Sequence, residues 1–152
     1  MSKEYWKPGN MLYPVPAVMV SCAREGETPN IITVAWAGTV CSDPAMVSIS
    51  VRKERFSHRI IKDTGEFVIN LVNRPLVRAT DYCGVKSGRD VDKFKDLSVK
   101  EDENGVPYLT WASCGYLSCK VVSSMDLGTH TQFLADVIDA EALDGTAPVS
   151  YV

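Results

Sequence analysis

The chain has 152 residues, of which 45% are hydrophobic, and it carries a formal net charge of -3 with a sequence pI near 5.4. This length is typical of one domain, so we treat residues 1–152 as a single unit that is long enough to bury a real core. The acidic balance argues against nucleic acid or an anionic membrane as a partner, because such surfaces favour a protein with a broad basic face.

The cysteine and histidine pattern predicts neither a metal site nor a disulfide framework. Five cysteines make an odd number, no C-x-x-C pair occurs, and the two histidines show no zinc-ligand spacing. Reduced thiols of this kind are typical of a cytosolic protein. No apolar run follows a basic N-terminus, and no apolar stretch is long enough to span a bilayer. We therefore expect a soluble, cytoplasmic protein without a bound metal.

In chain order, a polar lead-in over residues 1–10 is followed mainly by strand patterns. Runs of branched residues alternate with turn signals, and the clearest period of two places Val47, Ile49 and Val51 on one face. We expect about six strands, with a shorter one at 108–111 and a C-terminal hairpin. The predicted strands cover residues 17–22, 31–40, 46–51, 67–72, 108–111, 115–124 and 131–143.

Two short helices are expected between these strands. Ser57 is a predicted N-cap for the first, which Gly65 is expected to end. The second covers residues 74–83, with Pro75 in its first turn and Gly84 at its end.

The two remaining segments are a loop and the C-terminal residues. Residues 85–95 are polar and too long for a tight turn, and such loops often carry function. The apolar residues 149–152 indicate a further pairing strand or a longer natural chain.

These elements predict a mainly β protein with short helices, arranged as an antiparallel barrel with the helices packed outside it. A parallel doubly wound sheet would need more helices between its strands. No G-x-G-x-x-G or P-loop signature occurs either.

A predicted strand and the helix after it bring together groups that bind an anion. Ser50 and Arg52 lie two residues apart, so their side chains project to the same face. Ser57 follows at the expected helix start, where free N–H groups favour a phosphate that Arg52 can grip with a bidentate fork. The alternative is an ordinary polar strand face followed by a solvated basic helix. Four neighbours add positive charge: Lys53, Arg55, His58 and Arg59.

The segment Thr33-Val34-Ala35-Trp36 is a second candidate. Its small residues would let a flat ligand approach the backbone, and Trp36 could stack on that ligand or wall its pocket. The alternative is a plain barrel strand with a buried tryptophan.

Two turn regions carry further candidates. His130 follows Gly128 at a hairpin tip, where a near-neutral pKa suits proton exchange or orientation of a cofactor amide; the alternative is an exposed turn histidine. The polar loop could cover a ligand, or it could be a solvated connection. Its candidate residues are Ser87, Gly88, Arg89, Asp90, Lys93 and Phe94.

Three consecutive motifs resemble the flavin reductase-like proteins that have the FMN-binding split barrel, and they look closest to the flavoredoxin-type branch. The motifs are N-x-x-T-V-A-W, S-D-P-A-M-V-S-I-S-V-R and F-S-H-x-x-I-x-x-T-G-E-F-V-I-N-L. The similarity covers about residues 10–143. It implies a split antiparallel β-barrel that forms a homodimer, with FMN bound at the subunit interface.

The resemblance also implies a role for each matching residue. His130 matches a histidine near the nicotinamide site of reductase members, where the family often has Gly-Asp-His and this chain has Gly128-Thr129-His130. The implied FMN contacts are Thr33, Val34, Ala35 and Trp36 along the isoalloxazine ring, Cys41 and Ser42 in the turn beside it, Ser50, Arg52 and Ser57 at the phosphate and ribityl chain, and Ser87, Gly88, Lys93 and Phe94 in a loop that closes over the flavin.

The implied function is an FMN-dependent oxidoreductase that passes electrons from NAD(P)H to free flavin or to a small acceptor. In such a protein the chain mainly supplies binding and electrostatics, and no protein nucleophile is required. A second interpretation is a flavoredoxin-type electron carrier that a protein partner reduces, without NAD(P)H activity. A third is a structural or interaction module that binds no flavin.

Overall fold

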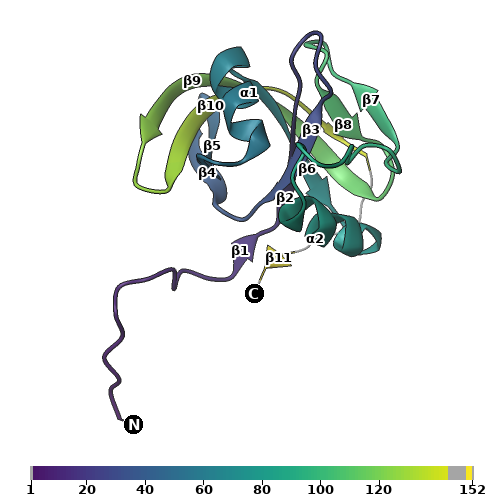
Figure 1. The fold of residues 1–152 in the computed structure, drawn as a ribbon. Helices are drawn as coiled ribbons and strands as arrows, with labels where there is room; N and C mark the ends of the chain where they lie inside the picture. Colours follow the sequence, from purple (N-terminus) through teal and green to yellow (C-terminus); the bar gives the residue numbers. More distant parts are fainter. Residues whose placement is uncertain (1, 144–149, 152) are drawn as a thin grey trace.

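The computed structural model describes residues 2–143 and 150–151, and most of its strands form one curled antiparallel sheet (Figure 1). The sheet has seven strands in the order β3-β2-β6-β9-β10-β5-β4. The predicted mainly β architecture with two short helices is confirmed. The strands of this sheet are β2 (Val18–Cys22), β3 (Asn30–Val34), β4 (Ala37–Ser42), β5 (Ala45–Arg52), β6 (Glu66–Val72), β9 (Ser113–Asp126) and β10 (His130–Ala142).

The two edge strands of the sheet, β3 and β4, follow each other directly in the chain. Only Ala35 and Trp36 separate them, so the sheet must curl until its two edges approach each other. The backbone N–H of Ser50 in β5 donates to the carbonyl of Trp36 at 2.9 Å. This bond extends the β4–β5 pairing by one step toward the link, while the two-residue link itself brings the edges β3 and β4 together.

Branched and aromatic side chains fill the barrel. On β5, Val47, Ile49 and Val51 are buried, whereas the residues between them are partly exposed, so the predicted alternation is confirmed. Phe67 from β6 and Phe133 from β10 are the largest side chains of the same core.

Helix α1 (Phe56–Thr64) packs its apolar face on this core. Arg55 is its N-cap residue, and Ser57 lies inside the first turn, so the predicted cap at Ser57 is wrong. The reason is tertiary, because the Ser57 hydroxyl is fully buried against Asn30. Gly65 ends the helix as predicted, with a left-handed φ of 68° that favours glycine.

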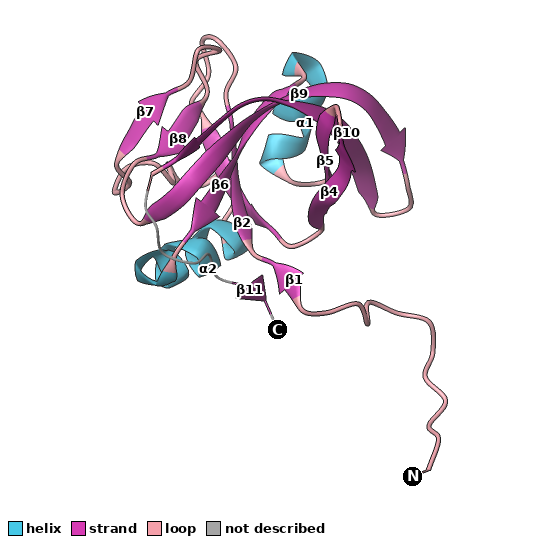
Figure 2. Ribbon diagram, turned by 180° about the vertical axis from the view of Figure 1, so that it is seen from behind, coloured by secondary structure: helices cyan, strands magenta, loops and turns pink. Residues whose placement is uncertain are grey.

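The second helical segment is a 3-10 turn, η1 (Arg74–Leu76), that continues into α2 (Val77–Val85). The predicted helix over 74–83 is therefore confirmed in place, but Gly84 lies inside its last turn instead of ending it. A Cβ at Gly84 would lie 3.2 Å from the Cβ of Thr33, so glycine allows α2 to pack closely on β3. Seen from both sides, α1 and α2 lie at different ends of the molecule (Figures 1 and 2).

The predicted strand over residues 31–40 is wrong, because it is two strands with different partners. Its first half, in β3, pairs with β2, and its second half, in β4, pairs with β5. Gly38 lies in the regular part of β4, opposite Ser48. The irregularity in register falls just after it, between Thr39 and Cys41.

A separate hairpin is formed by β7 (Val99–Glu101) and β8 (Pro107–Leu109). The sequence pattern placed a short strand at 108–111, one residue late, and it missed β7, which is short and has no buried residue. A strand of three exposed residues carries almost no hydrophobic period.

The last small sheet joins the two ends of the described chain. Strand β1 (Val15–Pro16) pairs with β11 (Ser150–Tyr151), so the expected pairing strand is confirmed for residues 150–151, while Val149 and Val152 lie outside the described residues. Before β1 the chain runs away from the body as an extended arm (Figures 1 and 2). Neither helix in the described part of the chain is long and apolar enough to cross a membrane.

Candidate functional site

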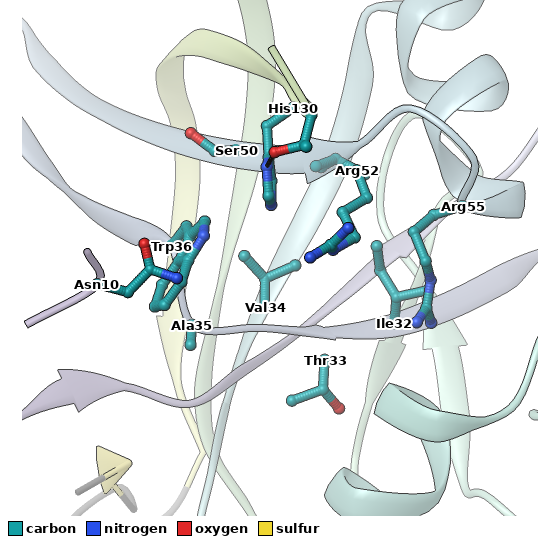
Figure 3. A pocket seen from close by; sticks show the side chains of 12 residues that line it. Asn10, Ile32, Thr33, Val34, Ala35, Trp36, Ser50, Arg52, Arg55 and His130 are labelled. Atoms are coloured by element: carbon teal, nitrogen blue, oxygen red, sulfur yellow. Dashed lines mark hydrogen bonds between the residues drawn. The ribbon is translucent and has the colours of Figure 1, made fainter. Parts of the chain in front are cut away.

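A cavity of about 360 Å³ opens where the barrel closes (Figure 3). The end of β3, the link into β4, the end of β5 and the tip of the β9–β10 hairpin all contribute to it. Three regions that the sequence pattern singled out separately therefore meet at one place. The lining residues are Asn10, Ile32, Thr33, Val34, Ala35, Trp36, Ser50, Val51, Arg52, Arg55, Thr129 and His130.

Residues 33–36 form one side of the cavity. Trp36 and Asn10 lie together there (Figure 3), and Trp36 is 41% exposed, so the alternative of a buried tryptophan is wrong. The Thr33 hydroxyl faces away from the cavity and donates to the Thr80 carbonyl in α2. Because β3 is an edge strand, the backbone groups on its outer side lie outside the sheet ladder and can hydrogen-bond a ligand.

Arg52 projects into the middle of the cavity from the end of β5 (Figure 3). Its guanidinium lies 3.4 Å from the carboxylate of Glu54, and both side chains are well exposed. Such a surface pair contributes little stability and is easily exchanged for a ligand. Ser50 lies two residues earlier on the same strand face and also lines the cavity. The prediction that Ser50 and Arg52 share one face is therefore confirmed.

Arg55 lines the side of the cavity away from Trp36 (Figure 3). Its guanidinium donates to the carbonyls of Gly84 at 2.8 Å and Cys83 at 3.1 Å, at the C-terminal end of α2. A helix C-terminus carries partial negative charge, so this contact fixes the orientation of Arg55. Burial lowers the pKa of Arg55, and the charge of Glu54 opposes that shift; the guanidinium nevertheless stays charged at neutral pH.

His130 is the first residue of β10 and lies opposite Arg52 in the sheet. It is half-buried in the cavity lining, and its Nδ1 lies 2.7 Å from the hydroxyl of Thr129. Burial and then the charge of Arg52 lower the pKa of His130, while Glu54 raises it. The imidazole is therefore neutral at neutral pH.

The structure does not bring Ser57 to the cavity. Its hydroxyl is 0% exposed and accepts a hydrogen bond from Asn30 Nδ2 at 2.8 Å. Burial raises the pKa of the neighbouring Cys22 thiol to about 11, although a hydrogen bond with Ser57 opposes the shift. This cluster is a buried polar part of the core, and its thiol is unreactive.

The polar loop packs against the body of the protein instead of lining the cavity. Lys93 is 4% exposed, and its Nζ donates to the Cys83 carbonyl at 2.9 Å, beside the contact made by Arg55. A Cβ at Gly88 would lie 2.4 Å from Asn30 Oδ1, so only glycine fits where the loop meets β3. The alternative of a solvated connection is wrong for these two positions.

Four other candidates also lie outside the lining. Phe94 packs on the core cluster that contains Met19, and Ser87 accepts a hydrogen bond from the backbone of its own loop. Cys41 and Ser42 pair with β5 at the far end of β4. Their contact with a flavin stays a prediction, as it does for Ser57, Gly88 and Lys93.

Sequence patterns missed four lining residues, Asn10, Ile32, Val51 and Thr129, of which Ile32 and Val51 are buried core side chains. Asn10 carried no signal, because the N-terminal arm is a polar lead-in without a period. Thr129 had one usable signal, its position beside His130 at the hairpin tip. No group of three or more His, Cys, Asp or Glu among the described residues is placed to hold a metal ion.

The chain belongs to the flavin reductase-like family, since the model of the flavin reductase like domain matches residues 10–152. It is 33% identical over 130 residues to the high molecular weight rubredoxin of Moorella thermoacetica, which covers 85% of this chain and 57% of that protein. It is 27% identical over 111 residues to the ferric-chelate reductase (NAD(P)H) of Archaeoglobus fulgidus, which covers 72% of this chain and 66% of that protein. The chain thus spans less than two thirds of each of these relatives.

Solved structures agree with the family. The flavoredoxin of Desulfovibrio vulgaris (Miyazaki F) has a TM-score of 0.83 at 29% identity and covers 97% of this chain and 83% of its own. An FMN-binding protein from Thermus thermophilus has a TM-score of 0.85 at 21% identity, over 95% of this chain and 82% of its own. The predicted split antiparallel barrel and the resemblance to the flavoredoxin branch are confirmed.

We expect the buried Lys93 to make the stability of the protein depend on pH. Burial, and then the charge of Arg55, lower the pKa of Lys93 to about 8, whereas a lysine in an unfolded chain titrates near ~10.4. Between these values the unfolded chain binds more protons than the folded one. The free energy of unfolding therefore rises with pH across this window, by at most about 1.4 kcal/mol per pH unit.

Urea unfolding at a series of pH values across this window measures the slope. Lys93→Met removes the titrating group and should flatten the curve, while Lys95→Met, which removes an exposed lysine from the same loop, should keep the wild-type slope. Parallel curves for the wild type and Lys93→Met would contradict a buried, perturbed ammonium.

Proposed function

We propose that the cavity binds FMN and that the protein uses it to transfer electrons from NAD(P)H to free flavin or to a small acceptor. The observation that carries this proposal is that the two sides of the cavity differ. One side has Trp36 and an open strand edge, and two guanidinium groups lie toward the other. A flat ring system suits the first side, and a phosphate suits the second.

The residues present fit this cofactor. Arg52 would grip the phosphate with two parallel hydrogen bonds, and the Ser50 hydroxyl would satisfy a further oxygen. Arg55 would add a fixed positive charge, because the carbonyls of α2 already orient it. Trp36 and the backbone of residues 33–35 would hold the ring, whose pyrimidine edge accepts hydrogen bonds from N–H groups. FMN, when bound, accepts a hydride and passes electrons on singly or in pairs.

His130 would serve the side of the cavity that receives the electron donor. Its imidazole is neutral and projects into the cavity between Trp36 and Arg52 (Figure 3). From there it would orient the carboxamide of a nicotinamide. Support for such a donor comes from the ferric-chelate reductase (NAD(P)H). The reductase component of a 4-nitrophenol monooxygenase of Rhodococcus opacus, to which this chain is 30% identical over 133 residues, supports a reductase more generally.

A second candidate function is an FMN electron carrier of the flavoredoxin type that a protein partner reduces. The likeness to two solved flavoredoxins, from Desulfovibrio vulgaris and Methanosarcina acetivorans, at 29% and 27% identity favours it. This function needs the same phosphate and ring contacts, but it makes no use of His130 toward a nucleotide.

We propose further that the protein is a cytoplasmic homodimer with the cofactor at the subunit interface. The thiols support the compartment, because all five cysteines are free. The apolar surface supports the dimer. Val40 on β4 and Val122, Met125 and Leu127 near the β9–β10 tip are each between 46% and 59% exposed, so a partner subunit that covers them would bury apolar area.

Arg52→Ala should weaken binding of FMN far more than binding of riboflavin. Loss of a charged hydrogen bond to the phosphate costs roughly 1.5–3 kcal/mol, and riboflavin has no phosphate to lose. Fluorescence titration of both ligands measures the difference. Arg59→Ala is the matched control, because Arg59 on α1 pairs with Glu27 of the β2–β3 turn and lies outside the cavity lining. Equal losses of affinity for FMN and riboflavin would contradict a contact between Arg52 and the phosphate.

Anaerobic stopped-flow mixing of the FMN-loaded protein with NADH or NADPH separates the two functions. A reductase bleaches the flavin absorption band within the turnover range of enzymes, on the order of 1–10³ s⁻¹. A carrier stays oxidised with both nucleotides but bleaches with dithionite, which is the control for a loaded and reducible cofactor. Purified protein that retains no FMN after reconstitution would contradict both proposed functions.

Light scattering at micromolar concentration tests the dimer. We expect the mass of two chains, and Val122→Lys together with Met125→Lys should shift the population toward the monomer, because they place like charges in the apolar patch. A wild-type monomer at this concentration would count against a cofactor site shared between subunits.

A further inference from the structure

The N-terminal arm, residues 2–13, leaves the body of the protein beside the cavity. Both views show it running outward in an extended form (Figures 1 and 2). No hydrogen bond joins residues 2–8 to the rest of the described chain, and the Trp6 indole N–H donates only to Glu4, 3.4 Å away. Pro8 favours extended backbone at its own position and at the residue before it, so the arm is stiff where it turns outward.

The arm carries large apolar side chains that its own chain does not cover. Tyr5 is 98% exposed and Trp6 is 65% exposed, and Leu12 and Tyr13 are exposed as well. Burial of such side chains against a partner removes apolar area from water, and aromatic residues are enriched in the cores of protein interfaces. The arm therefore has the composition of a segment that packs on another surface.

A second cavity, of about 320 Å³, lies between the base of the arm and the β3–β4 link. Its lining is mostly apolar and consists of residues 9–12, Val15 and residues 35–37. Ala35 and Trp36 line both cavities, so the second cavity adjoins the first one at the link. Its volume is enough for an aromatic side chain, since cavities from ~300 Å³ upward hold small ligands. The chain's own arm does not fill it, because residues 9–12 form its wall and the residues before them run outward.

The occupant that these observations favour is the arm of a second copy of this chain. An arm and an apolar cavity at its base allow two copies related by a two-fold axis to fill each other's cavities, which is an isologous contact. Residues 2–8 span roughly 23–25 Å when extended, which is enough to cross onto a neighbour. Strand β4 begins at this cavity and carries the exposed Val40, so the contact is continuous with the apolar surface proposed above for the dimer.

We propose that two copies of the chain exchange their N-terminal arms, and that Trp6 of each protomer enters the apolar cavity of its partner. There it lies beside Asn10 and Trp36, which meet at the mouth of the first cavity (Figure 3). Symmetry then places the two-fold axis midway between Trp6 and Asn10, near Pro8. The exchanged indole completes the wall behind Trp36, and its contribution to a flavin site rests on the proposed function.

Photo-crosslinking from p-benzoylphenylalanine at position 6 tests the exchange in the full chain without any cofactor. A mixture of nitrogen-15-labelled and unlabelled chains distinguishes links between chains from links within one chain. We expect a covalent dimer whose cross-linked peptides join position 6 to residues 9–12 or 35–37 of the other chain. The same photoreactive residue in place of Tyr82, which is exposed on α2, is the matched control and should give no covalent dimer. A sample without a covalent dimer, or with links between chains at other surfaces, would overturn the exchange.

Trp6→Ala should weaken the dimer, because the cavity of each subunit then loses its aromatic occupant. Sedimentation equilibrium should show a dissociation constant that rises roughly tenfold to a hundredfold, the range for truncation of a central interface aromatic. Tyr82→Ala removes another exposed aromatic side chain, outside this cavity, and should leave the constant unchanged. A constant that is the same in Trp6→Ala and the wild type would contradict the exchange.

FMN titration separates the exchange from the proposed function. At protein concentrations where Trp6→Ala is still dimeric, its affinity for FMN should fall roughly threefold to tenfold, since the wall behind Trp36 loses an aromatic contact. An unchanged affinity in the dimeric variant would show that the indole has no part in the flavin site. A wild-type protein that binds no FMN would instead refute the proposed function, and the cross-links would still decide the exchange.

Discussion

The two-residue link between β3 and β4 is the constraint on which the barrel and the cavity both depend. Two edges of a seven-stranded sheet cannot lie far apart when only Ala35 and Trp36 join them. Closure by this route leaves a corner instead of a ladder, because β3 and β4 are joined through the chain and are not paired with each other in the sheet. The cavity lies at that corner, so the residues that close the barrel are also the residues that line it.

The C-terminus of α2 determines which positive charges are available to a ligand. Arg55 and Lys93 both donate to the Cys83 carbonyl, so the helix end holds two cations from different parts of the chain. Lys93 is almost fully buried in this contact, and its side chain does not line the cavity. Arg55 keeps an exposed edge in the cavity, and Arg52 has only a weak surface partner. The anion-binding capacity of this face is therefore concentrated in two arginines.

The features that could be predicted from the sequence are those set by local geometry. Ser50 and Arg52 share a face because the period of a strand is two, and Gly65 ends α1 because few other residues adopt its φ. Ser57 and Lys93 could not be placed in this way. Their positions depend on Asn30 and Cys83, which belong to other elements, and no periodicity along the chain encodes such contacts.

The residues around the cavity differ in whether they distinguish a reductase from an electron carrier. Both proposed functions use the same proposed FMN contacts, Arg52 and the strand edge at residues 33–36, so these contacts do not distinguish a reductase from a carrier. The hairpin tip is different, because the proposed reductase uses His130 toward a nucleotide and the proposed carrier does not. Here the tip is held by Lys53, whose ammonium donates to the Leu127 carbonyl at 2.7 Å. This contact holds the backbone before His130 at the cavity, so the choice between the two functions rests on what His130 meets there.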